Sequence, residues 1–357
     1  MSLTIVAEGL RKRFGDKTAL DGVDLTVAAG TVHGVLGPNG AGKTTTVRIL
    51  ATLLRLDAGR ASVAGFDVMV KPERVRASIG LVGQHAAVDE ALSGRQNLEL
   101  FGRLYHLSTR DARTRAGELL GQFGLADTGA KAVRQYSGGM RRRLDLAASL
   151  ILRPKVLFLD EPTTGLDPRG RNEVWEAVRA LVREGTTVLL TTQYLDEADQ
   201  LASAISVIDH GRVIAEGSPA ALKSRLGGDR LDVVLHDVGE LAAAAAIVAK
   251  VTGTEPETQV DDRRVSAPVA EPLMALGEAV RALREADLGV EDVALRRPTL
   301  DEVFLHLTGE GVPVGPHEWD FRTGPGSKKD GSGSKEDGSL VASEVASGGA
   351  GPDMGAS

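Results

Sequence analysis

The chain has 357 residues, of which 42% are hydrophobic, 25% are charged and none is cysteine. This composition is typical of a globular protein of about two domains, and the lack of cysteine excludes disulfides and thiolate metal sites. The formal net charge of −7 argues against a nucleic-acid-binding protein, because binding phosphates requires a basic surface. No apolar run approaches the roughly 20 residues of a membrane helix, and residues 1–4 do not resemble a secretory signal, so we expect a cytosolic protein.

The first segment, residues 3–27, predicts a pair of antiparallel strands. Its apolar residues alternate with polar ones, and the pattern is interrupted at 15–17 (Gly-Asp-Lys), where we expect the turn. Phe14 lies directly before that turn. A nucleotide site further along the chain would make its ring a candidate platform for a purine base, whereas a place in the core of the hairpin is the alternative.

The segment Gly37 to Thr45 has the spacing of a phosphate-binding loop, in which a glycine and four further residues precede Gly-Lys-Thr. It also has the expected position, because it follows a buried apolar run and precedes a predicted helix from Lys43 to about Ala51. Its glycines would let successive backbone N–H groups point at a triphosphate, assisted by the helix N-terminus. Lys43 would reach the β and γ phosphates, and Thr44 would ligate Mg²⁺. The predicted phosphate-binding residues are Gly37, Pro38, Asn39, Gly40, Ala41, Gly42, Lys43, Thr44 and Thr45.

Two short buried strands are predicted next, at 61–63 and 79–82, and Gln84 follows the second. From Leu92 to Leu152 the spacing of apolar residues becomes helical, which indicates a helical insertion in a strand-rich domain. Within it, the sequence Leu92-Ser93-Gly94 predicts a helix cap.

The sequence at 136–140, Tyr-Ser-Gly-Gly-Met, leads into a further helix. Ser137 and the backbone N–H groups of Gly138 and Gly139 would open this helix and form a second anion site of the same physical kind as the first loop. Three arginines, 141–143, follow directly. We interpret them as a solvated face of the helix that attracts phosphate, in preference to a nucleic-acid patch.

A predicted buried strand at 156–159 ends in two carboxylates, Asp160 and Glu161. In a nucleoside triphosphatase, Asp160 would hold the metal and Glu161 would orient or deprotonate the attacking water. A solvated strand end is the alternative for this pair. The loop 164–167 ends in Asp167, and another buried strand at 188–191 leads to Gln193.

Residues 3 to about 217 resemble, in the order and spacing of these motifs, the nucleotide-binding subunit of an ATP-binding cassette (ABC) transporter. The resemblance implies an α/β P-loop NTPase cassette over residues 1–218, with a RecA-like core, an antiparallel β subdomain and a helical subdomain at about 85–152. It matches 37–45 to the Walker A loop, Gln84 to the Q-loop, 137–139 to the signature, Asp160 and Glu161 to Walker B, and 166–167 to the D-loop.

A narrower resemblance, to the daunorubicin/doxorubicin-resistance type of ATPase, is carried by residues 136–145, 191–199 and 300–305. Three positions depart from the wider family. The signature ends in Met140 where Gln is usual, and Phe14 stands where the adenine usually stacks on Tyr. Gln193 replaces the usual switch histidine, so it would sense the γ-phosphate through hydrogen-bond geometry, because an amide carries no titratable proton.

The resemblance implies a Mg²⁺-dependent ATPase in a head-to-tail homodimer, which exports a hydrophobic drug or antibiotic through a separate transmembrane permease. Such a protein lies peripherally on the cytoplasmic face of the cell membrane and binds no nucleic acid. The implied catalytic residues are Glu161, Gln193 and Gln84, and the implied metal ligands are Thr44, Gln84 and Asp160. The implied contacts to the ATP of the opposite subunit come from Ser137, Gly138, Gly139 and Asp167.

Two other functions remain open at this stage. A ribosome- or DNA-associated ABC ATPase usually joins two cassettes or carries a long coiled insertion, and the sequence has neither. A regulatory module that binds ATP without hydrolysing it would lack Glu161, which is present, although the replacement at Gln193 keeps this alternative open.

Residues 219–308 predict an α+β accessory domain with the strand and helix order of a split βαβ unit. By resemblance, it would stabilise the dimer or dock on the membrane subunit. Phe304, Leu305 and Leu307 are predicted to pack in the core from a short final helix. Residues 309–357 are rich in Gly, Ser, Lys, Glu and Asp, which predicts a disordered tail.

Overall fold

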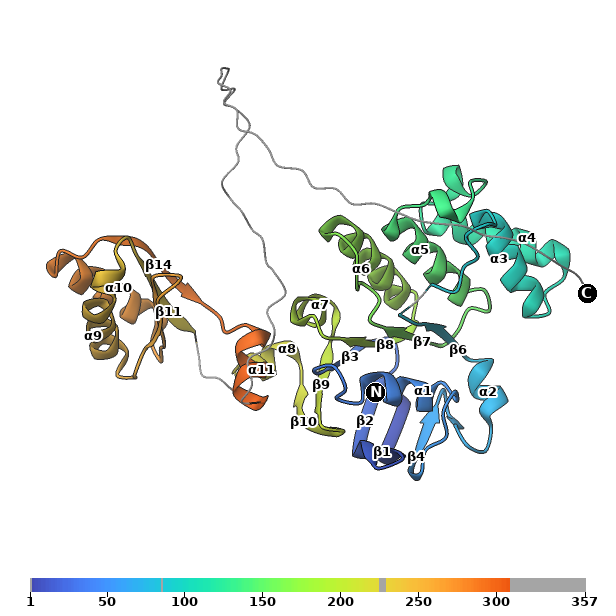
Figure 1. The fold of residues 1–357 in the computed structure, drawn as a ribbon, viewed down its shortest axis with the longest axis horizontal. Coiled ribbons are helices and arrows are strands. Elements are labelled where there is room, and N and C mark those ends of the chain that lie inside the picture. Colours follow the sequence, from blue (N-terminus) through green and yellow to red (C-terminus); the bar gives the residue numbers. More distant parts are fainter. Residues whose placement is uncertain (1, 85, 225–228, 309–357) are drawn as a thin grey trace, which may run out of the picture. The chain divides into compact units, whose positions relative to one another are not determined.

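A computed structural model describes residues 2–84, 86–224 and 229–308 (Figure 1). The predicted disordered tail therefore lies outside the described residues. Within those ranges, no helix is both long enough and apolar enough to cross a membrane.

The N-terminal segment forms an antiparallel sheet, as its alternation predicted. The hairpin of β1 and β2 is confirmed, and its turn lies at residues 15 and 16. The strand order is β2-β1-β4-β5. The four strands are β1 (Leu3–Phe14), β2 (Lys17–Ala28), β4 (Ala58–Val63) and β5 (Phe66–Asp67).

A second sheet of six strands, in the order β10-β9-β3-β8-β7-β6, forms the centre of the cassette region. Five of its strands are parallel, and β10 pairs antiparallel with β9. Strands β3, β7 and β8 are buried along their whole length, which explains their continuous apolar runs. The strands are β3 (Val32–Leu36), β6 (Ile79–Val82), β7 (Val156–Asp160), β8 (Thr187–Thr192), β9 (Ala204–Asp209) and β10 (Arg212–Gly217).

The helices of this region pack on two sides of the six-stranded sheet (Figure 1). One face meets α1 and the antiparallel sheet, and the other meets α5 and α6. Because the carboxyl ends of parallel strands share one edge, the loops after β3, β6, β7 and β8 converge there. The helices outside the insertion are α1 (Lys43–Leu50), α2 (Pro72–Arg76), α6 (Pro168–Arg183), α7 (Leu195–Leu201) and α8 (Pro219–Ser224).

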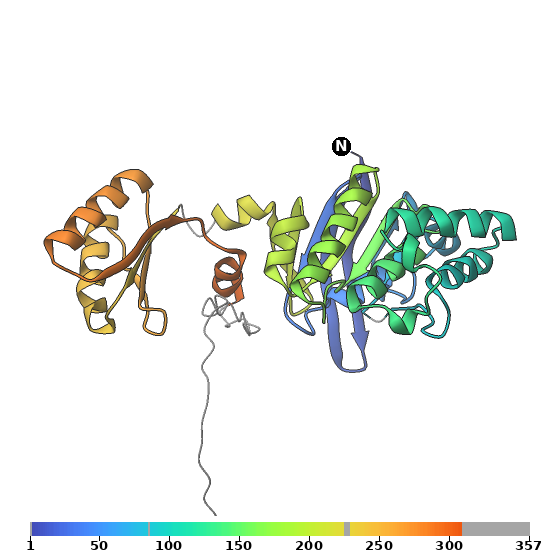
Figure 2. The ribbon, with the colours of Figure 1, turned by 90° about the horizontal axis from the view of Figure 1, so that it is seen from above.

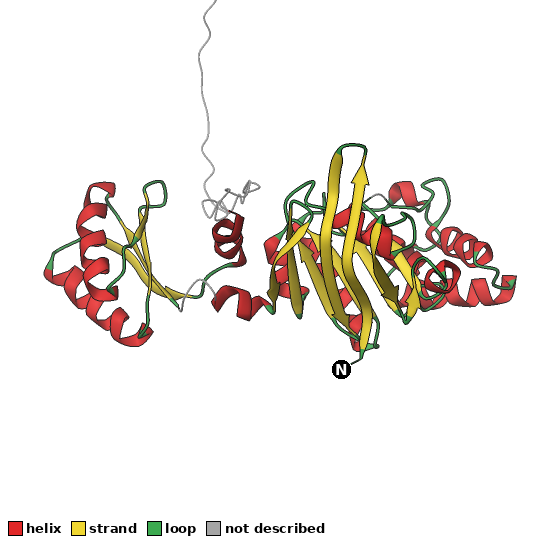
Figure 3. Cartoon of the chain, turned by 90° about the horizontal axis from the view of Figure 1, so that it is seen from below, coloured by secondary structure: helices red, strands yellow, loops and turns green. Residues whose placement is uncertain are grey.

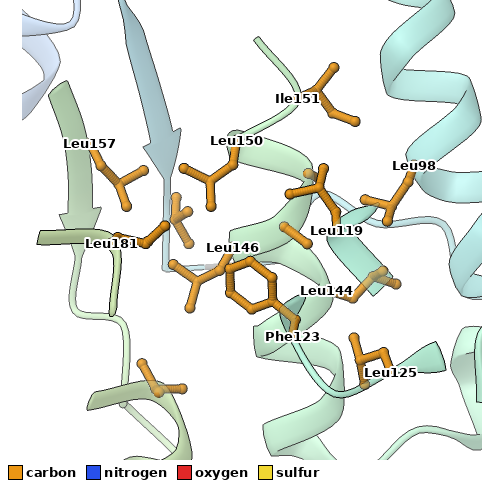
Figure 4. Packing of buried hydrophobic residues seen from close by; sticks show 14 of the residues in the cluster. Leu98, Leu119, Phe123, Leu125, Leu144, Leu146, Leu150, Ile151, Leu157 and Leu181 are labelled. Atoms are coloured by element: carbon orange, nitrogen blue, oxygen red, sulfur yellow. The ribbon is translucent and has the colours of Figure 1, made fainter. Parts of the chain in front are cut away.

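The predicted helical insertion is confirmed by α3 (Gly94–Leu104), α4 (Thr109–Gln122) and α5 (Gly138–Ser149), with short 3₁₀ turns at 126–128 and 133–135. Ser93 caps α3 in a capping box with Gln96, so the predicted cap is confirmed. Leu119, Phe123 and Leu144 of the insertion belong to the same buried cluster as Leu157 of β7, and Figure 4 shows Leu146 and Leu150 between Leu157 and the rest. This shared core fixes α5 against the sheet that carries the carboxylates.

The C-terminal region is α+β, and its strands and helices follow the predicted order. All its strands pair antiparallel in the order β12-β13-β11-β14. Both helices pack on one face of that sheet (Figures 2 and 3). The elements are β11 (Arg230–Leu235), α9 (Leu241–Thr252), β12 (Glu257–Gln259), β13 (Arg264–Pro268), α10 (Pro272–Glu285) and β14 (Val290–Arg296).

The final helix, α11 (Leu300–Thr308), buries one stripe of side chains. Leu300, Val303 and Phe304 join a cluster with residues of α7 and α8, and Leu307 packs at its edge. The prediction that Leu305 belongs to the core is wrong, because its side chain is 41% exposed. The buried positions follow the i, i+3, i+4, i+7 spacing of one helix face, and residue 305 lies outside that spacing.

Candidate functional site

The loop between β3 and α1 has a shape that only glycine permits at two positions. A Cβ on Gly37 would lie 2.1 Å from the carbonyl oxygen of Ile208. Gly42 has φ +115°, and a Cβ there would lie 2.6 Å from Leu20 Cδ2 and 2.8 Å from the oxygen of Ala19. Neighbouring backbone therefore closes around the loop, and it turns directly into the N-terminus of α1.

Lys43, at the start of α1, is 4% exposed and bonds to its own loop. Its Nζ donates to the carbonyl oxygens of Gly37 and Pro38, at 2.7 and 3.0 Å. The nearest carboxylate oxygen, Glu161 Oε1, lies 3.8 Å away. Burial lowers the pKa of the Lys43 ammonium, and the charges of Glu161 and Asp160 oppose that effect without cancelling it. Among the described residues, the ammonium therefore has Glu161 as its anionic partner, in an ion pair of 3.8 Å.

Asp160, the last residue of β7, joins two neighbouring segments. Its Oδ1 accepts hydrogen bonds from the hydroxyls of Thr44, at 3.1 Å, and Thr191, at 2.6 Å. Thr191 lies opposite Asp160 in the parallel register of β7 and β8. Sequence reasoning did not assign Thr191 to the site, because the pairing of two strands 31 residues apart leaves no local signal.

Glu161 turns out of the sheet with a φ of +50°, which is unusual for a residue other than glycine. Its backbone N–H donates to the carbonyl oxygen of Thr191 at 3.0 Å, and its side chain is 11% exposed. Thr164 Oγ1 lies 3.5 Å from its Oε2. Residues that hold such backbone conformations cluster at functional sites, where surrounding contacts maintain them.

Lys43, Thr44 and Glu161 line a pocket of about 300 Å³, the lower end of the range for small-molecule sites, and Asp160 lies outside its lining. It combines residues from the hairpin, the glycine loop, the segment after β6 and the end of β7. Phe14 lines this pocket with a half-exposed ring, and Gln84 lines it as well. The lining residues are Phe14, Lys17, Ala19, Asn39, Gly40, Gly42, Lys43, Thr44, Thr45, Gln84 and Glu161.

Several predicted site residues lie elsewhere in the described chain. The pocket lining does not include Ser137, Gly138, Gly139, Asp167 or Gln193. Ser137 instead caps α5 by accepting from the N–H of Met140 at 3.2 Å. Asp167 caps α6 by accepting from the N–H of Gly170 at 2.9 Å, and Gln193 is half-buried after β8. Gly37, Pro38 and Ala41 shape the loop without lining the pocket.

The interpretation of the three arginines as a solvated face is wrong for Arg142. Its side chain is 7% exposed, whereas that of Arg141 is 34% exposed and pairs with Glu90. Arg143 donates to the carbonyl oxygen of Phe123 at 2.9 Å and pairs with Glu173. Three consecutive arginines look equivalent in the sequence, and only the packing of α5 against the sheet distinguishes them.

Comparison with known proteins assigns this architecture. Residues 20–164 match the family model described as "ABC transporter". The daunorubicin resistance ATP-binding protein DrrA3 of Streptomyces coeruleorubidus is 68% identical over 306 residues, which cover 86% of this chain and 96% of that protein. The chain belongs to the ABC transporter ATP-binding proteins. The cassette is therefore an ATP-binding enzyme that hydrolyses ATP.

Further comparisons refine this assignment of the cassette. The daunorubicin/doxorubicin resistance ATP-binding protein DrrA of Streptomyces peucetius is 53% identical, and the match covers 85% of this chain and 92% of that protein. The predicted narrower resemblance is thus confirmed. The structure of cbiO1 from Clostridium perfringens, part of an ABC transporter complex, has a TM-score of 0.59 at 27% identity, covering 63% of this chain and 92% of that one. Cassette subunits of ABC transporters work with membrane permeases.

Proposed function

We propose that this cassette hydrolyses ATP in a head-to-tail homodimer and powers the export of a hydrophobic drug through a separate membrane permease. The related proteins named for daunorubicin and doxorubicin resistance support that substrate class. The protein would lie on the cytoplasmic face of the cell membrane, attached through the permease.

The proposal of a dimer rests on the separation of two anion sites, the pocket around Lys43 and the N-terminus of α5 at Ser137. The pocket gathers Lys43, Thr44 and Glu161, whereas Ser137 opens α5 outside the pocket lining. A helix N-terminus attracts phosphate, and a second copy of the chain could place its own α5 over the γ-phosphate. Ser137, Gly138 and Gly139 would then contact the ATP of the partner subunit, and Asp167 would lie at the interface.

The residues around Asp160 fit a magnesium ion. Thr44 Oγ1 and Asp160 Oδ1 are hard oxygen donors 3.1 Å apart, and Mg²⁺ prefers one or two such protein ligands with phosphate oxygens and waters. Gln84 lines the same pocket and would complete the protein ligands. The ion would neutralise charge on the β and γ phosphates.

The remaining chemistry belongs to the side chains of the chain. Lys43 would exchange its carbonyl partners for phosphate oxygens, and Phe14 would stack on the adenine. Glu161 would orient the attacking water and accept its proton, since its carboxylate already faces the pocket. Gln193 would donate a hydrogen bond to the γ-phosphate, and Gln84 would report the occupied site to the permease.

Dimerisation is tested with Glu161→Gln, which would bind ATP and turn it over about 100-fold more slowly than the wild type. Size-exclusion chromatography should show a dimer of this variant in ATP and a monomer without nucleotide. Adding Gly138→Asp should abolish the dimer while ATP affinity is kept, because a carboxylate at the start of α5 repels phosphate. Gly121→Asp is the matched control, because residue 121 is exposed on α4 with no atom near its added Cβ. A dimer that persists with Gly138→Asp would contradict the proposal.

Export is tested separately with the membrane subunit that co-purifies with the tagged chain. Vesicles that contain both proteins should accumulate doxorubicin when Mg²⁺ and ATP are added on the cassette side. Vesicles that carry Glu161→Gln should not accumulate the drug. Equal accumulation in both preparations, or none in either, would contradict drug export.

A further inference from the structure

Arg142 occupies a central position between three segments of the cassette. It lies on α5, two turns or less from Ser137, and is 6% exposed. Its Nε donates to the carbonyl oxygen of Pro162 at 2.7 Å, and its Nη1 donates to that of Gly83 at 2.7 Å. Its Nη2 lies 3.4 Å from the carbonyl oxygen of Glu161. One guanidinium therefore joins α5 to the backbone before Gln84 and to the backbone at Glu161.

Asp145 extends this connection by one helical turn. It is 4% exposed, and its Oδ2 lies 3.3 Å from Arg142 Nη1. Its Oδ1 accepts a hydrogen bond from the N–H of Ala87 at 2.9 Å. Arg142 and Asp145 thus hold the backbone at Gly83 and Ala87, which lie on either side of Gln84.

The pair is costly to bury, so stability alone is a poor explanation of it. Burial lowers the pKa of Arg142 and raises that of Asp145, and the charge of each opposes the shift of the other. Buried ion pairs can often be replaced by apolar residues without loss of stability. What apolar residues cannot replace is the set of donors that Arg142 directs at three carbonyl oxygens.

We propose that Arg142 and Asp145 are positioning residues that hold the Gln84 segment and Glu161 in fixed register with the signature helix. The inference rests on the roles proposed above for Gln84 and Glu161. Glu161 has a backbone conformation that surrounding contacts must maintain, and Arg142 reaches the carbonyl oxygens of both Glu161 and the next residue. A displacement of the Gln84 segment by the permease would then move α5 and the catalytic carboxylate together.

The test separates positioning from stability by removing the pair in two steps. Arg142→Met should lower the thermal midpoint, because it leaves Asp145 buried and unpaired. The double variant Arg142→Met with Asp145→Leu should recover the midpoint. Its kcat should stay about 10- to 100-fold below wild type, because a misplaced catalytic group costs up to about 100-fold. The Kd for ATP should change less than twofold, because the described hydrogen bonds and ion pairs of Arg142 and Asp145 include neither Lys43 nor Phe14.

A matched control uses Arg115, which also donates from a largely buried side chain to carbonyl oxygens, those of Leu150 and Ile151. Arg115→Met should lower the midpoint and leave kcat unchanged. If the double variant recovers kcat together with the midpoint, Arg142 is merely structural and the inference is wrong.

Arg142→Lys keeps the test decisive should the double variant fail to fold. It retains the charge, but an ammonium on a flexible stem cannot direct donors at three carbonyls at once. We expect it to fold with a reduced kcat and an unchanged Kd for ATP, and a wild-type kcat would overturn the inference. Glu161→Gln serves as the reference: if it retains full turnover, the proposed catalytic role is wrong, which is a different failure from that of Arg142.

Discussion

Two groups of charges, each buried or partly buried, differ in the distance between each charge and its partner of opposite sign. In the described part of the cassette, Lys43 Nζ donates hydrogen bonds to two carbonyl oxygens, and its ion pair with the Glu161 carboxylate is long, at 3.8 Å. In the C-terminal sheet, Arg296 lies 2.5 Å from Asp232 and forms two bonds of 2.7 and 2.8 Å with Glu302. Charges of the second kind are satisfied by one another and hold elements together. Charges of the first kind remain available to a ligand.

In the C-terminal network, which consists of Arg230, Asp232, Ser266, Arg296 and Glu302, the polar side chains bond to one another. Ser266 donates to Asp232 and accepts from the Nε of Arg230. Hydrogen bonding to Glu302 and Asp232 raises the pKa of Arg296, although burial opposes the shift. Burial alone would raise the pKa of Glu302, but its bonds from Arg296 and Thr299 outweigh that effect and leave the pKa lowered. The network thus ties β11, β13 and β14 to the start of α11.

The largest effect expected is on stability and comes from the C-terminal network. Arg296→Met should lower the free energy of unfolding by about 3–5 kcal/mol, because it leaves the buried carboxylate of Asp232 without its cation. Urea denaturation of the purified chain measures this loss. The Kd for ATP should stay at the wild-type value, and a tenfold weaker affinity would show that the two groups of charges are coupled.

In the cassette we expect a large loss of activity with little loss of stability. Lys43→Met should reduce kcat/KM for ATP by about 100- to 1,000-fold, the usual effect of removing one preorganised donor from a charged transition state. The free energy of unfolding should fall little, because the lost partners of Lys43 are two carbonyl oxygens of its own loop. Steady-state phosphate release and urea denaturation measure the two quantities. A large stability loss with normal turnover would invert the comparison.

The sequence predicted the parts of the site whose chemistry is local. The glycine loop with Lys43 and Thr44 lies in one segment, and Asp160 and Glu161 are adjacent at the end of an apolar run. The fold class followed from the family resemblance that these motifs carry, and the apolar runs predicted individual buried strands, because fully buried parallel strands leave a continuous signal. Phe14 depended on knowledge of the family, since its own segment fitted a core position equally well.

The sequence did not predict contacts that depend on tertiary packing. Thr191 bonds to Asp160 only because β7 and β8 pair in one particular register. Arg142 differs from its two neighbours only through the rotation of α5 against the sheet. Leu305 belongs to an apolar cluster in sequence, yet its helix presents it to solvent. Each case depends on how separate segments pack against one another, and the spacing of apolar residues along the sequence does not reveal that packing.

A buried histidine lies in the cassette but, like the C-terminal charges, contributes to stability. His33 of β3 is 2% exposed, and its Nε2 lies 2.9 Å from Ser206 Oγ. Burial lowers its pKa to about 4, from 6.5 in the unfolded chain. The unfolded state therefore gains a proton first as the pH falls, so stability present above pH 6.5 is lost on acidification.

Between pH 7 and pH 5 this linkage should cost about 2 kcal/mol of unfolding free energy. Urea denaturation at both pH values measures it. His33→Leu should lack this component, whereas a variant of His106, which lies at an exposed position, should keep it. An identical pH dependence in His33→Leu would contradict the assigned pKa.

The smallest effect is expected on ATP affinity, from the change of Phe14, which lines the pocket with a half-exposed ring. Base–aromatic stacking is worth about 1–3 kcal/mol, and the half exposure of Phe14 sets the lower part of that range. Phe14→Ala should therefore weaken ATP binding by roughly 5- to 30-fold, measured by equilibrium titration, without changing the free energy of unfolding. Phe14→Tyr should bind ATP like the wild type. Unchanged affinity in Phe14→Ala would assign the ring to the hairpin surface instead.

The central claim is that the charged side chains of the cassette pocket, Lys43 and Glu161, perform ATP hydrolysis. It is tested most directly by Mg²⁺-dependent ATP turnover of the purified chain, wild type beside Glu161→Gln, with the Kd for ATP measured on both. The wild type should turn over, and the variant should turn over about 100-fold more slowly with an unchanged Kd. Binding without turnover in both proteins, even with the membrane subunit present, would contradict the account and favour a regulatory module that only holds ATP.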